Sequence, residues 1–223
     1  RSWTGTDEHL IVLEAALDRG CSLIDTAWPR VAQHVEPAVG RVLARRLDAA
    51  VVVAGAADVE PGALTRRVRV SAGWLRRDRL DVLLLDDPAR ILAAPGGGRR
   101  IQQAVEALET LADHGELGRY GLRLGRMTNG GRSTDDGGLT AAGATARCLD
   151  LARQVRPDHR MSVVEAPCEM LRPDVRTHVP DLMAVARGSR LTTIGTRPLP
   201  VWPTSGVAPM ATCQRYLLDG VDH

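Results

Sequence analysis

The sequence contains no lysine and no phenylalanine, and all 29 of its basic residues are arginine. Only two tyrosines and four tryptophans are present, so a hydrophobic core must consist mainly of leucine, valine and alanine. Such a core is feasible, because a chain of this length buries roughly 70% of the surface that it exposes when unfolded. Arginine in place of lysine, together with abundant alanine and glycine, indicates a high-GC bacterium.

Other missing features argue against further classes of protein. No apolar run approaches the roughly 20 residues that a membrane-spanning helix needs, and no signal peptide is visible, although the chain does not begin with methionine. The four cysteines have no paired spacing, which argues against a zinc site and predicts buried free thiols in a reducing cytoplasm. The net charge is only +2 and the arginine pairs are expected on solvated helix faces, so no nucleic-acid-binding face is predicted.

Short apolar runs alternate with helical patterns along the chain. Strands are predicted at residues 22–26, 51–54, 80–85, 118–124, 161–166 and 191–196. Helices are predicted near residues 6–20, 37–47, 61–77, 99–114, 139–154, 179–186 and 209–218. Repeated strand–helix units imply an α/β fold with a parallel sheet, which is either an open doubly wound sheet or most of a (βα)8 barrel. No linker is evident, so residues 1–223 are expected to form a single domain.

Several motifs, in their order and spacing, resemble the aldo-keto reductase family. The run Leu23-Ile24-Asp25-Thr26-Ala27, followed by Glu36 and Gly40, resembles the family's second-strand region. Later stretches with the same resemblance are residues 71–85, 115–121, 163–172 and 198–199. The resemblance implies a (βα)8 TIM barrel with its site at the C-terminal ends of the strands. It also implies that this barrel is truncated or incomplete at both ends.

The resemblance implies that most of the family's catalytic groups are replaced. The family reduces carbonyls with an Asp, a Tyr, a Lys and a His. Asp25 matches the first, whereas Arg30, Ala56 and Asp86 stand where the other three belong. A Tyr with an ordinary pKa of about 10 can protonate a carbonyl only if a nearby cation stabilises the phenolate. Arginine cannot act as this acid, and alanine offers neither charge nor hydrogen bond.

The cofactor side is altered as well. Arg123 and Leu124 stand where the resemblance places the Ser-Asn pair that holds the nicotinamide amide. Glu165 replaces a Gln, and Thr196 replaces the family's stacking aromatic residue. Together these changes disfavour NADPH, and no cofactor is expected.

Charged residues are nevertheless expected to gather at the strand ends. The predicted ring consists of Asp25, Asp86, Asp87, Arg123, Glu165 and Arg197, with Arg30 nearby. Asp25, without its usual lysine, is expected to pair with Arg30 or Arg123. The ring is either a set of ion pairs that fills an abandoned pocket or a new acid/base or anion-binding site. A Mg²⁺ ion would need at least two carboxylates on one ion, and no metal site is predicted.

Three functional hypotheses follow. The first is a degenerate aldo-keto reductase homologue that does not reduce carbonyls by itself and is an accessory or binding subunit of a biosynthetic oxidoreductase, in natural-product or antibiotic biosynthesis. The second is a non-redox dehydratase, cyclase or isomerase, with Asp25 and Asp86 as acid and base and with Arg30 or Arg123 holding an oxygen of the substrate. The third is an NADPH-dependent oxidoreductase with a rearranged site. A partner oxidoreductase, a homo-oligomer or a small-molecule ligand fits these hypotheses, whereas nucleic acid and membrane do not.

Overall fold

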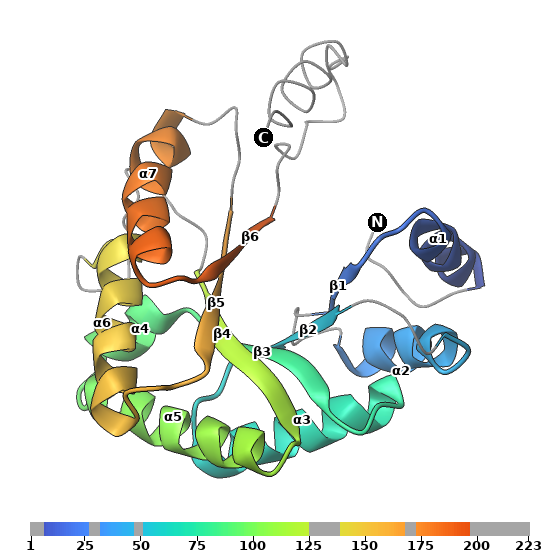
Figure 1. Cartoon of the computed structure of the whole chain (residues 1–223), viewed down its shortest axis with the longest axis horizontal. Coiled ribbons are helices and arrows are strands. Elements are labelled where there is room, and N and C mark those ends of the chain that lie inside the picture. Colours follow the sequence, from blue (N-terminus) through green and yellow to red (C-terminus); the bar gives the residue numbers. More distant parts are fainter. Residues whose placement is uncertain (1–6, 27–31, 47–50, 125–138, 168–172, 197–223) are drawn as a thin grey trace.

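The computed structural model describes residues 7–26, 32–46, 51–124, 139–167 and 173–196. In these residues helices alternate with strands, and Figure 1 shows the helices on the outside of a curved sheet. The helices are α1 (Asp7–Asp18), α2 (Ala32–Leu43), α3 (Pro61–Leu75), α4 (Pro88–Ala93), α5 (Gly97–Asp113), α6 (Ala141–Val155) and α7 (Pro173–Gly188). The strands are β1 (Leu23–Asp25), β2 (Val51–Ala56), β3 (Leu80–Asp86), β4 (Leu117–Arg123), β5 (Met161–Pro167) and β6 (Thr192–Thr196).

The strands of the described residues form one parallel sheet in the order β1-β2-β3-β4-β5-β6. A doubly wound sheet would reverse its direction of winding at a switch point, so its strand order would not follow the chain. Here every crossover moves one strand in the same direction, and the sheet curls like the wall of a barrel (Figure 1). The barrel-type α/β fold is therefore confirmed, and the doubly wound alternative is wrong.

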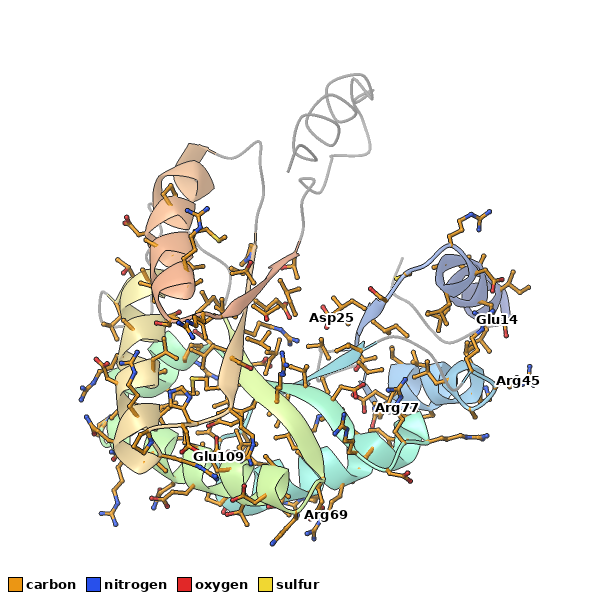
Figure 2. All side chains as sticks on the ribbon, in the orientation of Figure 1. Glu14, Asp25, Arg45, Arg69, Arg77 and Glu109 are labelled. Atoms are coloured by element: carbon orange, nitrogen blue, oxygen red, sulfur yellow. The ribbon has the colours of Figure 1, made fainter. Side chains whose placement is uncertain are left out.

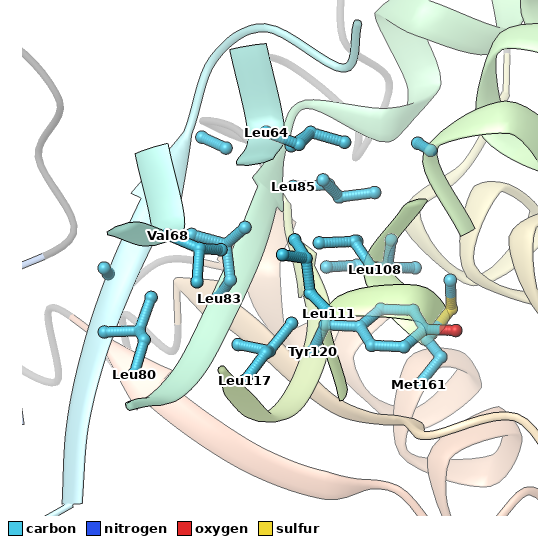
Figure 3. Close-up of a cluster of buried hydrophobic side chains, with 14 of the residues drawn as sticks. Leu64, Val68, Leu80, Leu83, Leu85, Leu108, Leu111, Leu117, Tyr120 and Met161 are labelled. Carbon is cyan, nitrogen blue, oxygen red and sulfur yellow. The ribbon is translucent and has the colours of Figure 1, made fainter. Parts of the chain in front are cut away.

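Side chains of the strands alternate between two hydrophobic faces. Residues on the outer face pack against the helices in the main cluster, among them Val52, Ala54, Leu83, Leu85 and Leu122. Residues on the inner face form a smaller cluster that consists of Val53, Val82, Leu84 and Val163. Figure 3 shows part of the main cluster, where side chains from α3 and α5 meet those of β3 and β4. Burial on both faces explains why the central strands are continuous apolar runs in the sequence.

The beginning of α3 follows from its local sequence. Glu60 precedes Pro61, and its carboxylate accepts hydrogen bonds from the amides of Gly62 and Ala63 at 3.0 and 2.8 Å. Proline at the first helical position leaves no amide unpaired, and a negative charge at this end interacts favourably with the helix dipole. The predicted start of this helix is therefore confirmed, with its capping residue now identified.

The prediction that Pro37 opens a helix is wrong. α2 begins at Ala32 and continues through Pro37, which removes one hydrogen bond from the helix interior. Burial of Val39, Val42 and Leu43 on the same helix outweighs this cost. Two other helices also differ from the prediction: α7 begins before residue 179, and α4, which is too short to show a helical period, was not predicted. The helix predicted at residues 209–218 lies outside the described residues.

The structure also bears on the predictions about cysteines and membrane-spanning helices. Cys148 is a buried free thiol as expected, whereas Cys21 is exposed because it lies in the turn between α1 and β1. The prediction of buried thiols is therefore wrong for Cys21, and Cys168 and Cys213 lie outside the described residues. None of the helices that the structure describes is long and apolar enough to cross a membrane.

A buried ion pair joins α2 to α3 and to the end of β2. Glu36 is fully buried, and its two carboxylate oxygens accept hydrogen bonds from the guanidinium of Arg67 at 3.0 and 2.6 Å. Arg67 also donates through Nε to the backbone carbonyl of Gly55, at 2.9 Å. The hydroxyl of Thr26, directly after β1, lies 3.1 Å from Glu36 Oε1. This Glu36–Arg67 pair thus fixes the ends of β1 and β2 relative to both helices.

A second polar cluster lies at the opposite end of the sheet, where β4 and β5 begin. Tyr120 is fully buried and donates its hydroxyl proton to Glu109 at 2.8 Å, while Arg160 donates to Glu109 through its backbone amide and its guanidinium. Arg156 also pairs with Glu109, at 3.1 Å. In Figure 2, Glu109 lies on α5 in the outer layer, whereas Asp25 lies at the end of β1. This polar cluster thus lies near the N-terminal ends of β4 and β5, and it takes no part in the site at the C-terminal ends of the strands.

The close approach of α2 to α3 predicts opposite effects for two glycine substitutions. A Cβ atom at Gly40 would lie 2.1 Å from the carbonyl oxygen of Trp74, whereas nothing lies within 4 Å of a Cβ at Gly73 of α3. Gly40→Ala is expected to lower the free energy of unfolding by about 1–3 kcal/mol through overpacking. Gly73→Ala should raise it by about 0.5–1 kcal/mol, because alanine favours a helix interior. Urea unfolding followed by circular dichroism measures both, and equal effects would contradict the close packing.

Candidate functional site

The candidate site is built around Arg123, the last residue of β4. In the parallel register Arg123 is paired with Asp86 of β3 on one side and with Glu165 of β5 on the other. Residues paired in neighbouring strands point to the same face of a sheet, so these three charged side chains lie at one level at the C-terminal ends of the strands. Active sites of barrel enzymes occupy this end of the sheet.

The guanidinium of Arg123 contacts three carboxylates. Its Nε lies 3.0 Å from Glu165 Oε1, its Nη1 lies 3.1 Å from Asp86 Oδ1, and its Nη2 lies 3.6 Å from Asp25 Oδ1. The side chains of Arg123 and Glu165 are only 13% and 6% exposed, whereas that of Asp25 is 39% exposed. We refer to Arg123, Asp25, Asp86 and Glu165 as the Arg123 cluster. One guanidinium thus contacts three carboxylates at the strand ends.

Burial dominates the acidity of two of these acids. It raises the pKa of Glu165 to about 7, because the Arg123 guanidinium only partly offsets the loss of water and Asp25 and Asp86 add repulsion. Burial also raises the pKa of Asp86, again against the opposing effect of Arg123. Glu165 Oε2 is buried and has no hydrogen-bond partner within the described part of the chain. A pKa of about 7 means that Glu165 can bind or release a proton near neutral pH.

The structure brings together four of the residues predicted from the sequence. Asp25, Asp86, Arg123 and Glu165 meet as expected, and Arg123 is a partner of Asp25. Asp87 lies beside them, but its carboxylate is paired with Arg90 at 3.5 Å, in the loop that leads into α4. Arg30 and Arg197 lie outside the described residues.

The structure also shows where Ala56 lies, what Arg67 binds and whether the described residues could hold a metal ion. Ala56 belongs to the hydrophobic cluster on the helix side of β2, and it offers no charge to the strand ends. Sequence reasoning missed the role of Arg67, although Glu36, its partner, was part of the motif that carries the resemblance. In the part of the chain that the structure describes, no group of three His, Cys, Asp or Glu side chains could hold a metal ion. The three acids instead surround Arg123.

Comparisons with known proteins give a consistent result. The model of the aldo/keto reductase family matches residues 4–127. A glycerol dehydrogenase from Gluconobacter oxydans has a similar structure, with a TM-score of 0.67 at 19% identity over 95% of this chain and 61% of that one. An aldo/keto reductase from Klebsiella pneumoniae, solved with NADP and acetate, gives 0.63 at 21% identity over 88% of this chain and 60% of that one.

At these identities the two structures support the fold alone. This chain spans about 60% of the length of both proteins. A search of curated proteins finds no match to the sequence.

The raised pKa of Glu165 predicts how stability depends on pH. The folded protein binds this proton more tightly than the unfolded chain does, so the free energy of unfolding should fall as the pH rises from about 4.5 to about 7. Glu165→Gln should make this decrease in the free energy of unfolding smaller by on the order of 1–2 kcal/mol, because the amide does not titrate. Chemical unfolding at several pH values measures the slope. Glu106→Gln, on the exposed face of α5, is the matched control and should leave the slope unchanged.

Proposed function

This chain belongs to the aldo/keto reductase family, and we propose that it is a degenerate member that does not reduce carbonyls by itself but serves as an accessory or binding subunit of a biosynthetic oxidoreductase. The observation that carries the proposal is the position of the Arg123 guanidinium, which lies among three carboxylates at the strand ends. Carbonyl reduction by the family's route needs a Tyr that donates the proton and a bound hydride donor at this place. The cluster contains no Tyr, and the Arg123 guanidinium at its centre cannot release its proton.

The described residues also fit a nicotinamide poorly. Leu124 is buried among Val164, Ala166 and Leu182 and offers no hydrogen bond to a carboxamide. Glu165 Oε1 already accepts a hydrogen bond from Arg123, which occupies the position of the family's other amide-binding residue. The Klebsiella pneumoniae protein was solved with NADP, and an NADPH-dependent activity from a rearranged site is the competing proposal for this chain.

Calorimetry and co-purification test the proposal together. The purified chain should give no heat of binding with millimolar NADPH and no NADPH oxidation with a panel of aldehydes and ketones. Co-expression with an oxidoreductase encoded beside it should yield a heteromer that survives size-exclusion chromatography. NADPH turnover by the lone chain would refute the loss of reductase activity. A chain that stays monomeric beside every such neighbour would refute the accessory role.

A non-redox acid/base enzyme is the second candidate, and one observation favours it. Glu165 has a pKa of about 7, its buried Oε2 atom has no hydrogen-bond partner among the described residues, and it lies beside Asp25 and Asp86. An acid that titrates near neutral pH beside further carboxyl groups is suited to proton transfer. In this proposal Asp86 and Asp25 exchange protons with the substrate, and Arg123 stabilises an enolate oxygen.

Asp86→Asn separates the second candidate from the first. If the cluster moves protons, the native chain should exchange the α-protons of a suitable ketone for deuterium, and Asp86→Asn should lower that rate by about 100-fold or more. Proton NMR in deuterium oxide measures the exchange without knowledge of the product. Asp150→Asn is the matched control, because Asp150 pairs with Arg153 on the exposed face of α6 and should leave the rate unchanged. An undiminished rate in a folded Asp86→Asn protein would rule out this candidate.

A further inference from the structure

A cavity of about 380 Å³ lies beside the end of β2, separate from the Arg123 cluster. It is lined by Gln33 of α2, by the residues that end and follow β2, and by one face of α3. The α3 side chains that line it are Ala63, Arg66, Arg67, Val70 and Trp74. Their spacing of three or four residues places them along one side of the helix. A volume of this size falls in the range of small-molecule sites.

Small residues keep the cavity open. Gly55, Ala56 and Ala57 line one side and Ala63 lines another, so no long side chain from these positions fills the space. Ala56 stands where the resemblance places the family's catalytic lysine, and its side chain faces the helices. The small side chain of Ala56 thus leaves room beside β2.

The two arginines of the lining differ in their partners. Arg67 is held by both oxygens of Glu36 and by the carbonyl of Gly55, so its charge is neutralised and its position is fixed. The side chain of Arg66 is exposed and has no carboxylate partner or hydrogen bond within the described part of the chain. Arg66 therefore offers a full guanidinium to an anion, and two parallel hydrogen bonds to a carboxylate are its strongest interaction.

The rest of the lining limits the kind of anion. Val70 is 38% exposed and Trp74 is half-buried, so both present apolar surface to the cavity. Asp58 also lines it, and its Oδ1 accepts the amide hydrogen of Glu60 at 3.0 Å, which fixes this negative charge in the turn before α3. A ligand with two carboxylates would be repelled by Asp58, whereas a single carboxylate at Arg66 is compatible with it.

We propose that the cavity between α2 and α3 binds a small monocarboxylic acid with an apolar body. The carboxylate pairs with Arg66, and the apolar body packs against Val70 and the indole ring of Trp74. This site lies on the helix side of β2 and does not depend on the function proposed for the Arg123 cluster.

Titration with benzoate and cyclohexanecarboxylate tests the proposal. In ¹H–¹⁵N spectra of the whole chain, both acids should shift the indole N–H signal of Trp74, which is assigned by its loss in Trp74→Phe. Benzamide, the uncharged isostere of benzoate, should bind about tenfold more weakly or worse, because it forms no charge-assisted pair. Terephthalate, with a second carboxylate opposite the first, should also bind more weakly than benzoate.

Variants of the lining complete the test. Arg66→Gln should weaken benzoate binding by about tenfold or more, and Ala63→Leu should block it by filling the cavity. Arg100→Gln removes the same charge from the exposed face of α5 and should leave binding unchanged. Equal binding of benzoate and benzamide, unchanged affinity in Arg66→Gln, or no shift of the Trp74 signal with either acid would overturn the proposal.

Discussion

The bidentate pair between Glu36 and Arg67 is the interaction on which the arrangement of both candidate sites depends. A carboxylate without exposure to water needs a fully hydrogen-bonded partner, and Arg67 supplies it while it also binds the carbonyl of Gly55. The Arg67 guanidinium lines the cavity, and it partly offsets the rise that burial causes in the pKa of Asp86. One ion pair therefore fixes the end of β2, which lines the cavity.

The sequence predicts the strands well, because strands buried on both faces are continuous apolar runs. The barrel type of sheet follows only from the resemblance to the family, since the strand–helix pattern alone leaves a doubly wound sheet open. It predicts the start of α2 poorly, because the cost of Pro37 is outweighed by packing that only the folded chain shows. The members of the Arg123 cluster follow from the order of the strands, but the central place of Arg123 depends on side-chain reach. The cavity was not predicted, since it is made of small residues and one exposed arginine, which are equally typical of a solvated helix face.

In a chain without lysine, arginine forms the ion pairs that join its helices and strands. Arg67 and Arg77 belong to arginine pairs that were expected on solvated faces, yet Arg67 binds Glu36 and Arg77 binds Asp81 at 2.9 Å. Arg123 and Arg160 likewise join strand residues to their neighbours through two or more acids. A planar guanidinium can bridge several carboxylates at once, which an ammonium group does less well. Arginine thus supplies cross-links between elements, and its guanidinium keeps its charge because it does not deprotonate in proteins.

The uneven charge of the Arg123 cluster also acts beyond hydrogen-bonding distance. The cluster places three carboxylates and one guanidinium at the C-terminal ends of the strands. Charges placed there contribute to the electrostatic potential that an approaching charged molecule meets. Protonation of Glu165 near pH 7 removes one negative charge from this potential. The electrostatic attraction of the strand ends for charged molecules is thus expected to vary within the physiological pH range.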